Sequence, residues 1–118
     1  MTQPTVLVAE DDFIIACDLC DTVEEAGFCV EGPHNDVSSA MLAFQKHKPD
    51  LAILDIHLGD DVVYPLAERL MAENVPVIFH SGLADPKDVH ARYPQSSTLS
   101  KPCPPNEVIE TMSRALCA

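Results

Sequence analysis

The chain has 118 residues, of which 47% are hydrophobic, and it carries a formal net charge of −12 at pH 7. This length and apolar content predict one folded domain with its own core and exclude a disordered chain. An acidic surface repels a phosphate backbone, and the seven Lys and Arg residues form no basic stripe, so we expect no nucleic-acid binding. No apolar run approaches the roughly 18 residues of a membrane span, and no secretory signal is evident, which indicates a cytoplasmic protein without membrane insertion.

Short apolar segments alternate with helical patterns along the chain. We predict strands at residues 6–9, 28–30, 51–54, 75–79 and 97–100. We predict helices at residues 12–26, 36–47, 63–74, 86–91 and 106–116. In the first helix Ile15, Leu19 and Val23 fall at intervals of four residues, which is the spacing of one buried helical face. Asp12 is the expected N-cap of this helix, and Gly27 ends it.

Several boundaries rest on turn chemistry. The segments "GPHN" (32–35) and "HLGDD" (57–61) are predicted as loops. Asp36 or Asn35 can cap the second helix. Pro65 fits only the first turn of the third helix. The fourth helix, at 86–91, is short, because prolines bracket it closely.

The alternation of five strands with five helices implies parallel strands joined by crossover helices. Continuous apolar strands, covered on both faces, agree with such a sheet. The sequence therefore predicts an α/β fold. We found no linker and no repeat, and we expect one domain over residues 1–118 with no output domain.

Polar residues follow four of the predicted strands. Glu10 and Asp11 follow the first strand, Asp55 the third, Ser81 the fourth and Lys101 the fifth. Because the carboxyl ends of parallel strands meet at one rim of the sheet, we expect these side chains to converge there. Each could singly be a helix cap or a solvated loop residue, but four such strand ends together favour a functional site.

The chemistry of this set points to phosphoryl transfer. Three neighbouring carboxylates repel one another unless a cation lies among them, and carboxylate oxygens select Mg²⁺ or a similar ion such as Mn²⁺. A carboxylate can act as a nucleophile and form an aspartyl phosphate. A metal ion and an amine would then offset the charge of the transferred group, and a hydroxyl could donate a hydrogen bond to it.

Four motifs carry a resemblance to a known family: "VLVAED", "PDLAILDIHL", "VPVIFHSG" and "LSKP". With them the chain resembles, over essentially its whole length, the receiver domain of bacterial two-component response regulators. The resemblance implies a flavodoxin-like, doubly wound parallel sheet of five strands in the order 2-1-3-4-5, with five helices of which the fourth is short. It also implies a stand-alone phosphoprotein of a two-component system or phosphorelay.

The resemblance implies roles by position. Asp55 would accept the phosphoryl group from a phosphohistidine on a sensor histidine kinase or a histidine phosphotransfer protein. Asp11 would bind Mg²⁺ directly, together with Asp55, and Glu10 would act through water. His57 would offer the metal its backbone carbonyl.

Further roles concern the switch. Ser81 would be the switch hydroxyl, Lys101 the phosphate-binding amine, and the bond before Pro102 would be cis. The family usually carries an aromatic residue three positions before the lysine, where this chain has Thr98. This replacement predicts a different route from the phosphorylated site to the rest of the domain.

These considerations predict a phosphoacceptor switch, not an enzyme, acting by contact with a downstream protein that the sequence does not identify. One alternative is a degenerate receiver fold that binds partners without phosphate. A less favoured alternative is a phosphohydrolase with Asp55 as nucleophile, since enzymes of that type need a second acid two residues later, where this chain has His57.

Overall fold

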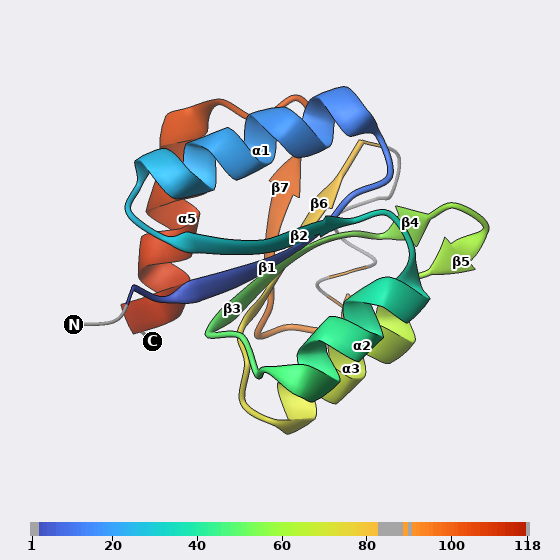
Figure 1. The fold of residues 1–118 in the computed structure, drawn as a ribbon. Helices are drawn as coiled ribbons and strands as arrows, with labels where there is room; N and C mark the ends of the chain where they lie inside the picture. The colour runs from blue at the N-terminus through green and yellow to red at the C-terminus, as the bar shows by residue number, and fades with distance from the viewer. Residues whose placement is uncertain (1–2, 83–88, 90, 118) are drawn as a thin grey trace.

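The computed structural model describes residues 3–82, 89 and 91–117. A parallel sheet lies at its centre (Figure 1), with the strand order β2-β1-β3-β6-β7. Two short strands that follow β3 in the chain lie outside the main sheet. When only the strands of the main sheet are counted, their order is the predicted 2-1-3-4-5. The five strands of the sheet are β1 (Thr5–Ala9), β2 (Cys29–His34), β3 (Leu51–Asp55), β6 (Val77–Ser81) and β7 (Ser97–Ser100).

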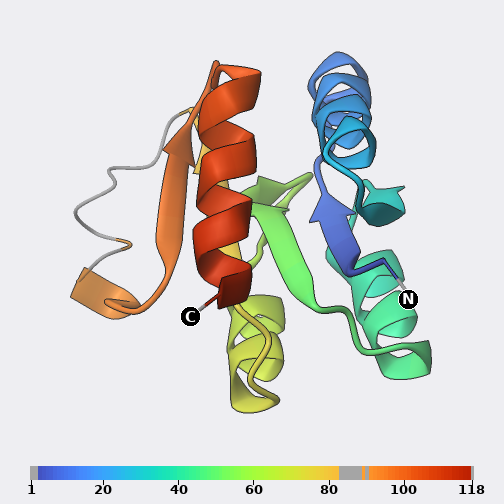
Figure 2. The ribbon, with the colours of Figure 1, turned by 90° about the vertical axis from the view of Figure 1, so that its left-hand side faces the viewer.

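Helices cover both faces of the sheet (Figures 1 and 2). On one face lie α1 (Phe13–Glu25) and α5 (Pro105–Cys117), and on the other lie α2 (Val37–Lys46) and α3 (Tyr64–Ala72). These are the four helices with defined bounds in the described part of the chain. The predicted helix at 86–91 falls mostly outside the described residues. None of the described helices has the length and apolar character to cross a bilayer.

The core has two layers because successive side chains of a strand point to opposite faces. In β3 all five residues are buried. Leu51 and Ile53 pack on the side of α1 and α5, whereas Ala52 and Leu54 pack on the side of α2 and α3. Burial on both faces explains why the first four residues, Leu51 to Leu54, form a continuous apolar run, and Asp55 ends the strand.

The predicted helix starts are confirmed. Asp12 is the N-cap of α1, and its carboxylate accepts hydrogen bonds from the backbone amides of Ile14 and Ile15. Asp36 caps α2 through the amide of Ser39, at 2.7 Å. Pro65 lies in the first turn of α3, where its missing N–H leaves no broken helical bond.

The prediction that "GPHN" is a loop is wrong, because β2 continues through His34. Leu7 pairs with Glu31 but Ala9 pairs with His34, so two residues of β2 bulge opposite one residue of β1. Gly32 has φ +122°, and the peptide bond between Gly32 and Pro33 is cis. The pairing resumes when the amide of Glu10 donates to His34 at 2.9 Å.

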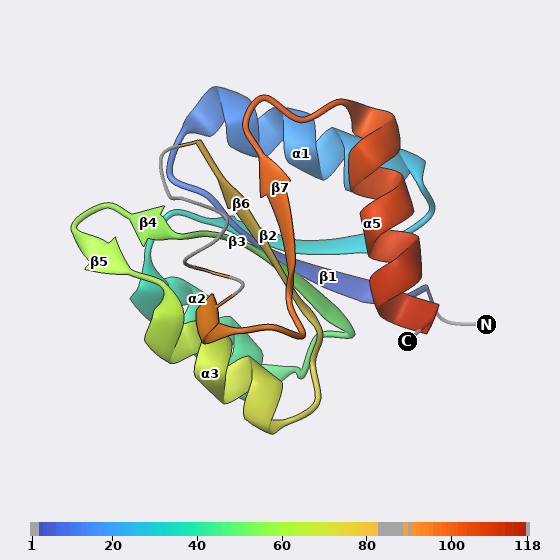
Figure 3. The same cartoon turned by 180° about the vertical axis from the view of Figure 1, so that it is seen from behind.

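The segment "HLGDD" is likewise not simply a loop. Its ends form a small antiparallel hairpin of β4 (His57–Leu58) and β5 (Asp61–Val62), which projects beyond the main sheet (Figure 3). Gly59, with φ +60°, lies at the turn. Two-residue strands are too short to leave a periodic signal in sequence.

The fourth predicted strand is displaced by two residues, since β6 begins at Val77 and not at residue 75. The chain leaves α3 through Asn74, which has φ 64°, and the amide of Val75 donates to the carbonyl of Leu70. Pro76 has no amide hydrogen and precedes the strand. The shift places Ser81 at the last position of β6.

The bulge in β2 predicts a specific intolerance. A Cβ atom on Gly32 would lie 2.6 Å from the carbonyl oxygen of Val8, whereas a Cβ on Gly27 would meet nothing within 4 Å. Both glycines have positive φ. Gly32→Ala should therefore lower the free energy of unfolding by about 3 kcal/mol and Gly27→Ala by about 1 kcal/mol, measured by urea denaturation. Equal losses would mean that the bulge relaxes to admit a methyl group.

Candidate functional site

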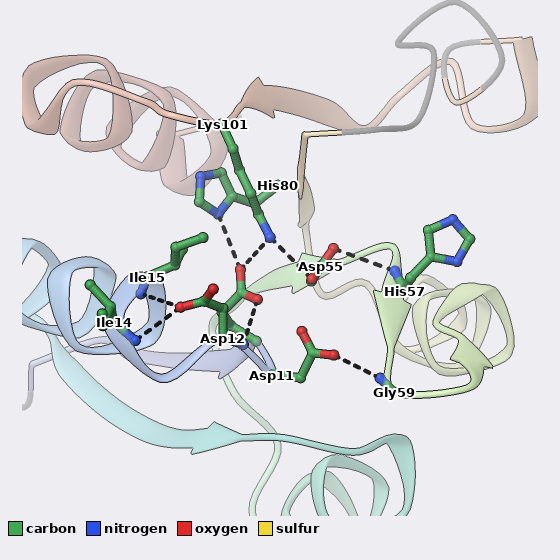
Figure 4. A network of polar contacts seen from close by, with 10 residues as sticks. Asp11, Asp12, Ile14, Ile15, Asp55, His57, Gly59, His80 and Lys101 are labelled. Atoms are coloured by element: carbon green, nitrogen blue, oxygen red, sulfur yellow. Dashed lines mark hydrogen bonds and ion pairs between the residues drawn. The ribbon is translucent and has the colours of Figure 1, made fainter.

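The three predicted acidic residues meet at one edge of the sheet, where Figure 4 labels Asp11 and Asp55. β1 and β3 are parallel neighbours, with Ala9 beside Leu54, so the residues that follow share this edge. Glu10, Asp11 and Asp55 each offer a carboxylate oxygen, and these oxygens lie within 4.8 Å of one another. A group of hard oxygen ligands at this spacing has the composition of a site for a divalent cation.

The three carboxylates differ in environment. Glu10 is 2% exposed and Asp55 8% exposed, whereas Asp11 is exposed. Burial raises the pKa of Glu10, and its contact with Lys101 opposes this rise. The backbone amide of Gly59 donates to Asp11 Oδ2 at 2.9 Å and holds the pKa of Asp11 below its ordinary value. Asp11 is therefore ionised at neutral pH.

Lys101 brings a positive charge to the carboxylates from the end of β7, an edge strand of the sheet. It follows β7, and its Nζ lies 2.5 Å from Glu10 Oε1 and 3.1 Å from Asp55 Oδ2. Burial alone would lower the pKa of this amine, but the hydrogen bonds and attraction of the two carboxylates outweigh it and raise the pKa. Lys101 is therefore charged, and it offsets part of the repulsion between the acids.

The β4–β5 hairpin supplies backbone donors to the same edge. The amide of His57 donates to Asp55 Oδ1 at 3.4 Å, and the amide of Gly59 reaches Asp11. One short segment thus holds both Asp11, which follows β1, and Asp55, which ends β3 (Figure 4). The role of the Gly59 amide was not predicted from the sequence, because it depends on the path of a turn.

Ser81 lies at this edge too, at the last position of β6 beside Ser100. Its carbonyl accepts a hydrogen bond from the amide of Lys101 at 3.1 Å, and the bond between Lys101 and Pro102 is cis in the structure. Thr98 pairs with Phe79 further back along β6 and β7, away from the strand ends. Sequence reasoning therefore placed Ser81 and Lys101 at the correct rim.

Aromatic side chains gather beside Phe79 on the face of α3. The ring of Tyr93 stacks on Phe79 with centroids 5.6 Å apart, and Tyr64 meets Phe79 edge-on at 5.9 Å. The hydroxyl of Tyr93 donates to Glu68 at 2.7 Å. The sequence analysis did not predict this cluster, because its members come from distant parts of the chain.

His80 is a second residue that sequence reasoning missed. Its side chain points to the face of α1 and α5, by alternation with Phe79, and the residue is 5% exposed. Its Nδ1 lies 4.0 Å from Glu10 Oε1. Burial lowers the pKa of His80 to about 4, and the nearby charge of Lys101 adds to this effect. The available signal was a histidine inside the otherwise apolar run "VIFHS".

Comparison with known proteins identifies the class of domain. Residues 6–113 match the model of the response regulator receiver domain family. A stretch of 71 residues is 34% identical to the transcriptional regulatory protein PdtaR of Mycobacterium tuberculosis, covering 57% of this chain but only 35% of that protein. The chain thus spans about a third of the length of the curated relative that it matches.

Solved structures of response regulator receiver domains have the same fold as this chain. The receiver domain of the PhyR response regulator of Erythrobacter litoralis is 29% identical, with a TM-score of 0.88 over 99% of this chain and 92% of that one. A response regulator receiver protein from Sinorhizobium medicae has a TM-score of 0.89 over 98% and 96% of the two chains, and at 24% identity it supports the fold alone. The chain belongs to the response regulator receiver domain family, the signalling switches of two-component systems.

The depressed pKa of His80 predicts a pH effect on stability. Since the folded pKa, about 4, lies below the ordinary 6.5, the unfolded chain binds this proton more readily, and stability falls as pH falls through that interval. Between pH 7 and about pH 4.5, the free energy of unfolding of wild type should fall by about 2 kcal/mol more than that of His80→Leu. Urea denaturation at the two pH values measures this difference.

The exposed His47 gives a matched control for this measurement. His47→Gln should follow the pH dependence of wild type. If His80→Leu also followed wild type, the imidazole of His80 would be accessible to protons in the folded state.

Proposed function

We propose that this receiver domain is a phosphoacceptor switch in which Asp55 takes a phosphoryl group from a phosphohistidine on a sensor histidine kinase or a histidine phosphotransfer protein. The observation that supports this proposal best is the convergence of Asp55, an acid pair and Lys101 at the carboxyl edge of a parallel sheet. The family membership makes phosphoryl signalling the expected use of this set.

The transfer needs a nucleophile and compensation of charge. A carboxylate oxygen of Asp55 would form a bond to phosphorus while the bond from phosphorus to the donor imidazole breaks. The imidazole nitrogen keeps the electron pair and takes a proton from solvent. Lys101, already 3.1 Å from Asp55 Oδ2, would offset negative charge on the phosphoryl oxygens.

Glu10, Asp11 and Asp55 would hold Mg²⁺ or Mn²⁺, with the backbone carbonyl of His57 as a further ligand. Their oxygen donors, their spacing and the excess of negative charge suit a hard divalent cation. The ion, when bound, would supply positive charge beside the phosphoryl oxygens. Asp11 is the most exposed of these acids and stays ionised, which suits a direct ligand.

The response to phosphate would begin at Ser81. Its hydroxyl would donate a hydrogen bond to a phosphoryl oxygen and draw the end of β6 toward Asp55. The family's aromatic residue is replaced by Thr98 in this chain, so we assign the readout to the surface around β6, acting by contact with a downstream protein. A cytoplasmic location would suit such a switch.

The metal assignment predicts a contrast between neighbouring acids. Asp11→Asn should weaken Mg²⁺ binding by about tenfold or more, measured by titration calorimetry, because a direct ligand loses its charge. Asp12→Asn removes the same charge one residue away, and asparagine still caps α1. Asp12→Asn should bind Mg²⁺ nearly as wild type does. Equal weakening would indicate a diffuse effect of charge and no ligand role for Asp11.

The phosphoacceptor assignment predicts a mass change at one residue. With Mg²⁺ and acetyl phosphate, wild type should gain the mass of one phosphoryl group, and Asp55→Asn should gain none, because an amide oxygen is a poor nucleophile. The control is Asp60→Asn, an exposed carboxylate in the turn of the hairpin, which should be labelled as wild type is. Labelling of Asp55→Asn would refute the assignment. Absence of labelling in wild type would favour a receiver that works without phosphate or accepts only from its protein donor.

A further inference from the structure

A hollow of about 830 Å³ lies at the amino ends of β6 and β7, at the edge of the sheet opposite to the phosphoacceptor site. Figure 3 shows the start of β7 and the last turns of α3 and α5 on this side of the molecule, away from the tip of the β7 arrow. The volume of the hollow falls within the range of small-molecule sites.

The charge of this hollow is opposite to that of the whole chain. Arg92 and Arg114 line it, and no Asp or Glu does among the residues that the structure describes. The acids of the phosphoacceptor site lie beyond the other end of β6, about 13 Å away at the rise of a strand. This separation exceeds the screening length at physiological salt. The hollow is therefore a local positive site on a chain with a net charge of −12.

Aromatic rings hold the guanidinium of Arg92. Its Cζ lies 4.5 Å from the ring centroid of Tyr64 and 5.7 Å from that of Tyr93. Its Nε donates to the Tyr93 hydroxyl at 3.2 Å, and that hydroxyl donates to Glu68. Glu68 thus accepts from the tyrosine, and within the described part of the chain Arg92 forms no ion pair. Its Nη groups are left for a ligand.

The opposite wall carries the second cation. Nη2 of Arg114 donates to the hydroxyl of Thr111 at 3.5 Å, and Thr111 is buried. Arg114 likewise has no carboxylate partner among the described residues. Between the two arginines, the amide and the hydroxyl of Ser96 both donate to the carbonyl of Tyr93, at 3.1 and 2.8 Å. These bonds fix the connection that leads from Arg92 into β7.

The rest of the wall is largely apolar. Met71, Val75, Val77 and Ala115 line it, which suits the hydrocarbon body of an organic ligand. The end of α3 would repel an anion if its last carbonyls were unpaired. The carbonyl of Leu70 accepts from the amides of residues 73 and 75, and that of Met71 accepts from the amide of residue 74. These bonds limit the repulsion.

We propose that this hollow binds a small organic dianion of the dicarboxylate class. Arg92 and Arg114 each bind one carboxylate, because the guanidinium fork matches two carboxylate oxygens. The apolar wall covers the chain between the two carboxylates. Two cations favour a dianion over a monocarboxylate, and the apolar wall favours an organic acid over inorganic phosphate. This site is separate from the phosphoacceptor and requires neither a metal ion nor a phosphoryl donor.

The test compares succinate, adipate and suberate, which differ in the distance between their carboxylates. Hexanoate has the chain length of adipate with one carboxylate, and inorganic phosphate has no apolar body. Each is titrated at constant ionic strength into the ¹⁵N-labelled full chain without Mg²⁺, and the amide resonances of Ser97 and Ala115 are followed by NMR. We expect saturable shifts with at least one dicarboxylate. We expect hexanoate to bind about tenfold more weakly than adipate, because one charge-assisted contact is lost.

Three variants locate the site. Arg92→Gln and Arg114→Gln should each weaken the best dicarboxylate by about tenfold. Arg69→Gln removes the same charge from an exposed position of α3 outside the hollow and should bind nearly as wild type does. Because Arg92 also packs on two rings, Arg114→Gln decides the outcome if Arg92→Gln disturbs the whole spectrum.

Two kinds of result would overturn the proposal. If no dicarboxylate gives saturable shifts, the hollow binds no such ligand. Equal weakening in Arg69→Gln and Arg114→Gln would indicate a diffuse effect of charge and no site. Phosphate or hexanoate binding as tightly as the best dicarboxylate would refute the assignment of the ligand class.

Discussion

The electrostatic repulsion between Glu10, Asp11 and Asp55 is the constraint on which the rest of the site depends. Their oxygens lie within 4.8 Å of one another, and two of the three residues are buried. Like charges at this distance are tolerated only beside positive charge or strong donors. Lys101 supplies the charge and the β4–β5 hairpin supplies backbone amides. The distant strand β7 is thereby tied electrostatically to β1 and β3.

Most of the fold could be predicted because its signals are local. Continuous apolar strands, a helix stripe of Leu19 and Val23, and caps such as Asp12 are written in neighbouring residues, and alternation of strands and helices implies the parallel sheet. The errors occurred where tertiary contacts override local signals. Gly32 and Pro33 resemble a loop, yet pairing with β1 holds them in a strand. The β4–β5 hairpin is too short to show a period.

The candidate site likewise contains residues whose position could be predicted from the sequence and residues whose position could not. Glu10, Asp55 and Lys101 could be predicted to converge, because topology alone brings the ends of parallel strands together. The amide of Gly59 could not, since the path of a turn decides where it points. The position of His80 could not be predicted either, because only the folded structure brings its buried ring beside the carboxylate of Glu10.

The bulge in β2 has a consequence for association between molecules. β2 is an edge strand, and an exposed edge with unpaired backbone groups is a template on which a second chain can extend the sheet. Pro33 offers no amide hydrogen, and the positive φ of Gly32 breaks the regular spacing of donors and acceptors. Gly32 and Pro33, which the sequence analysis assigned to a loop, therefore disfavour pairing of β2 with a strand of a second molecule at this end of the edge.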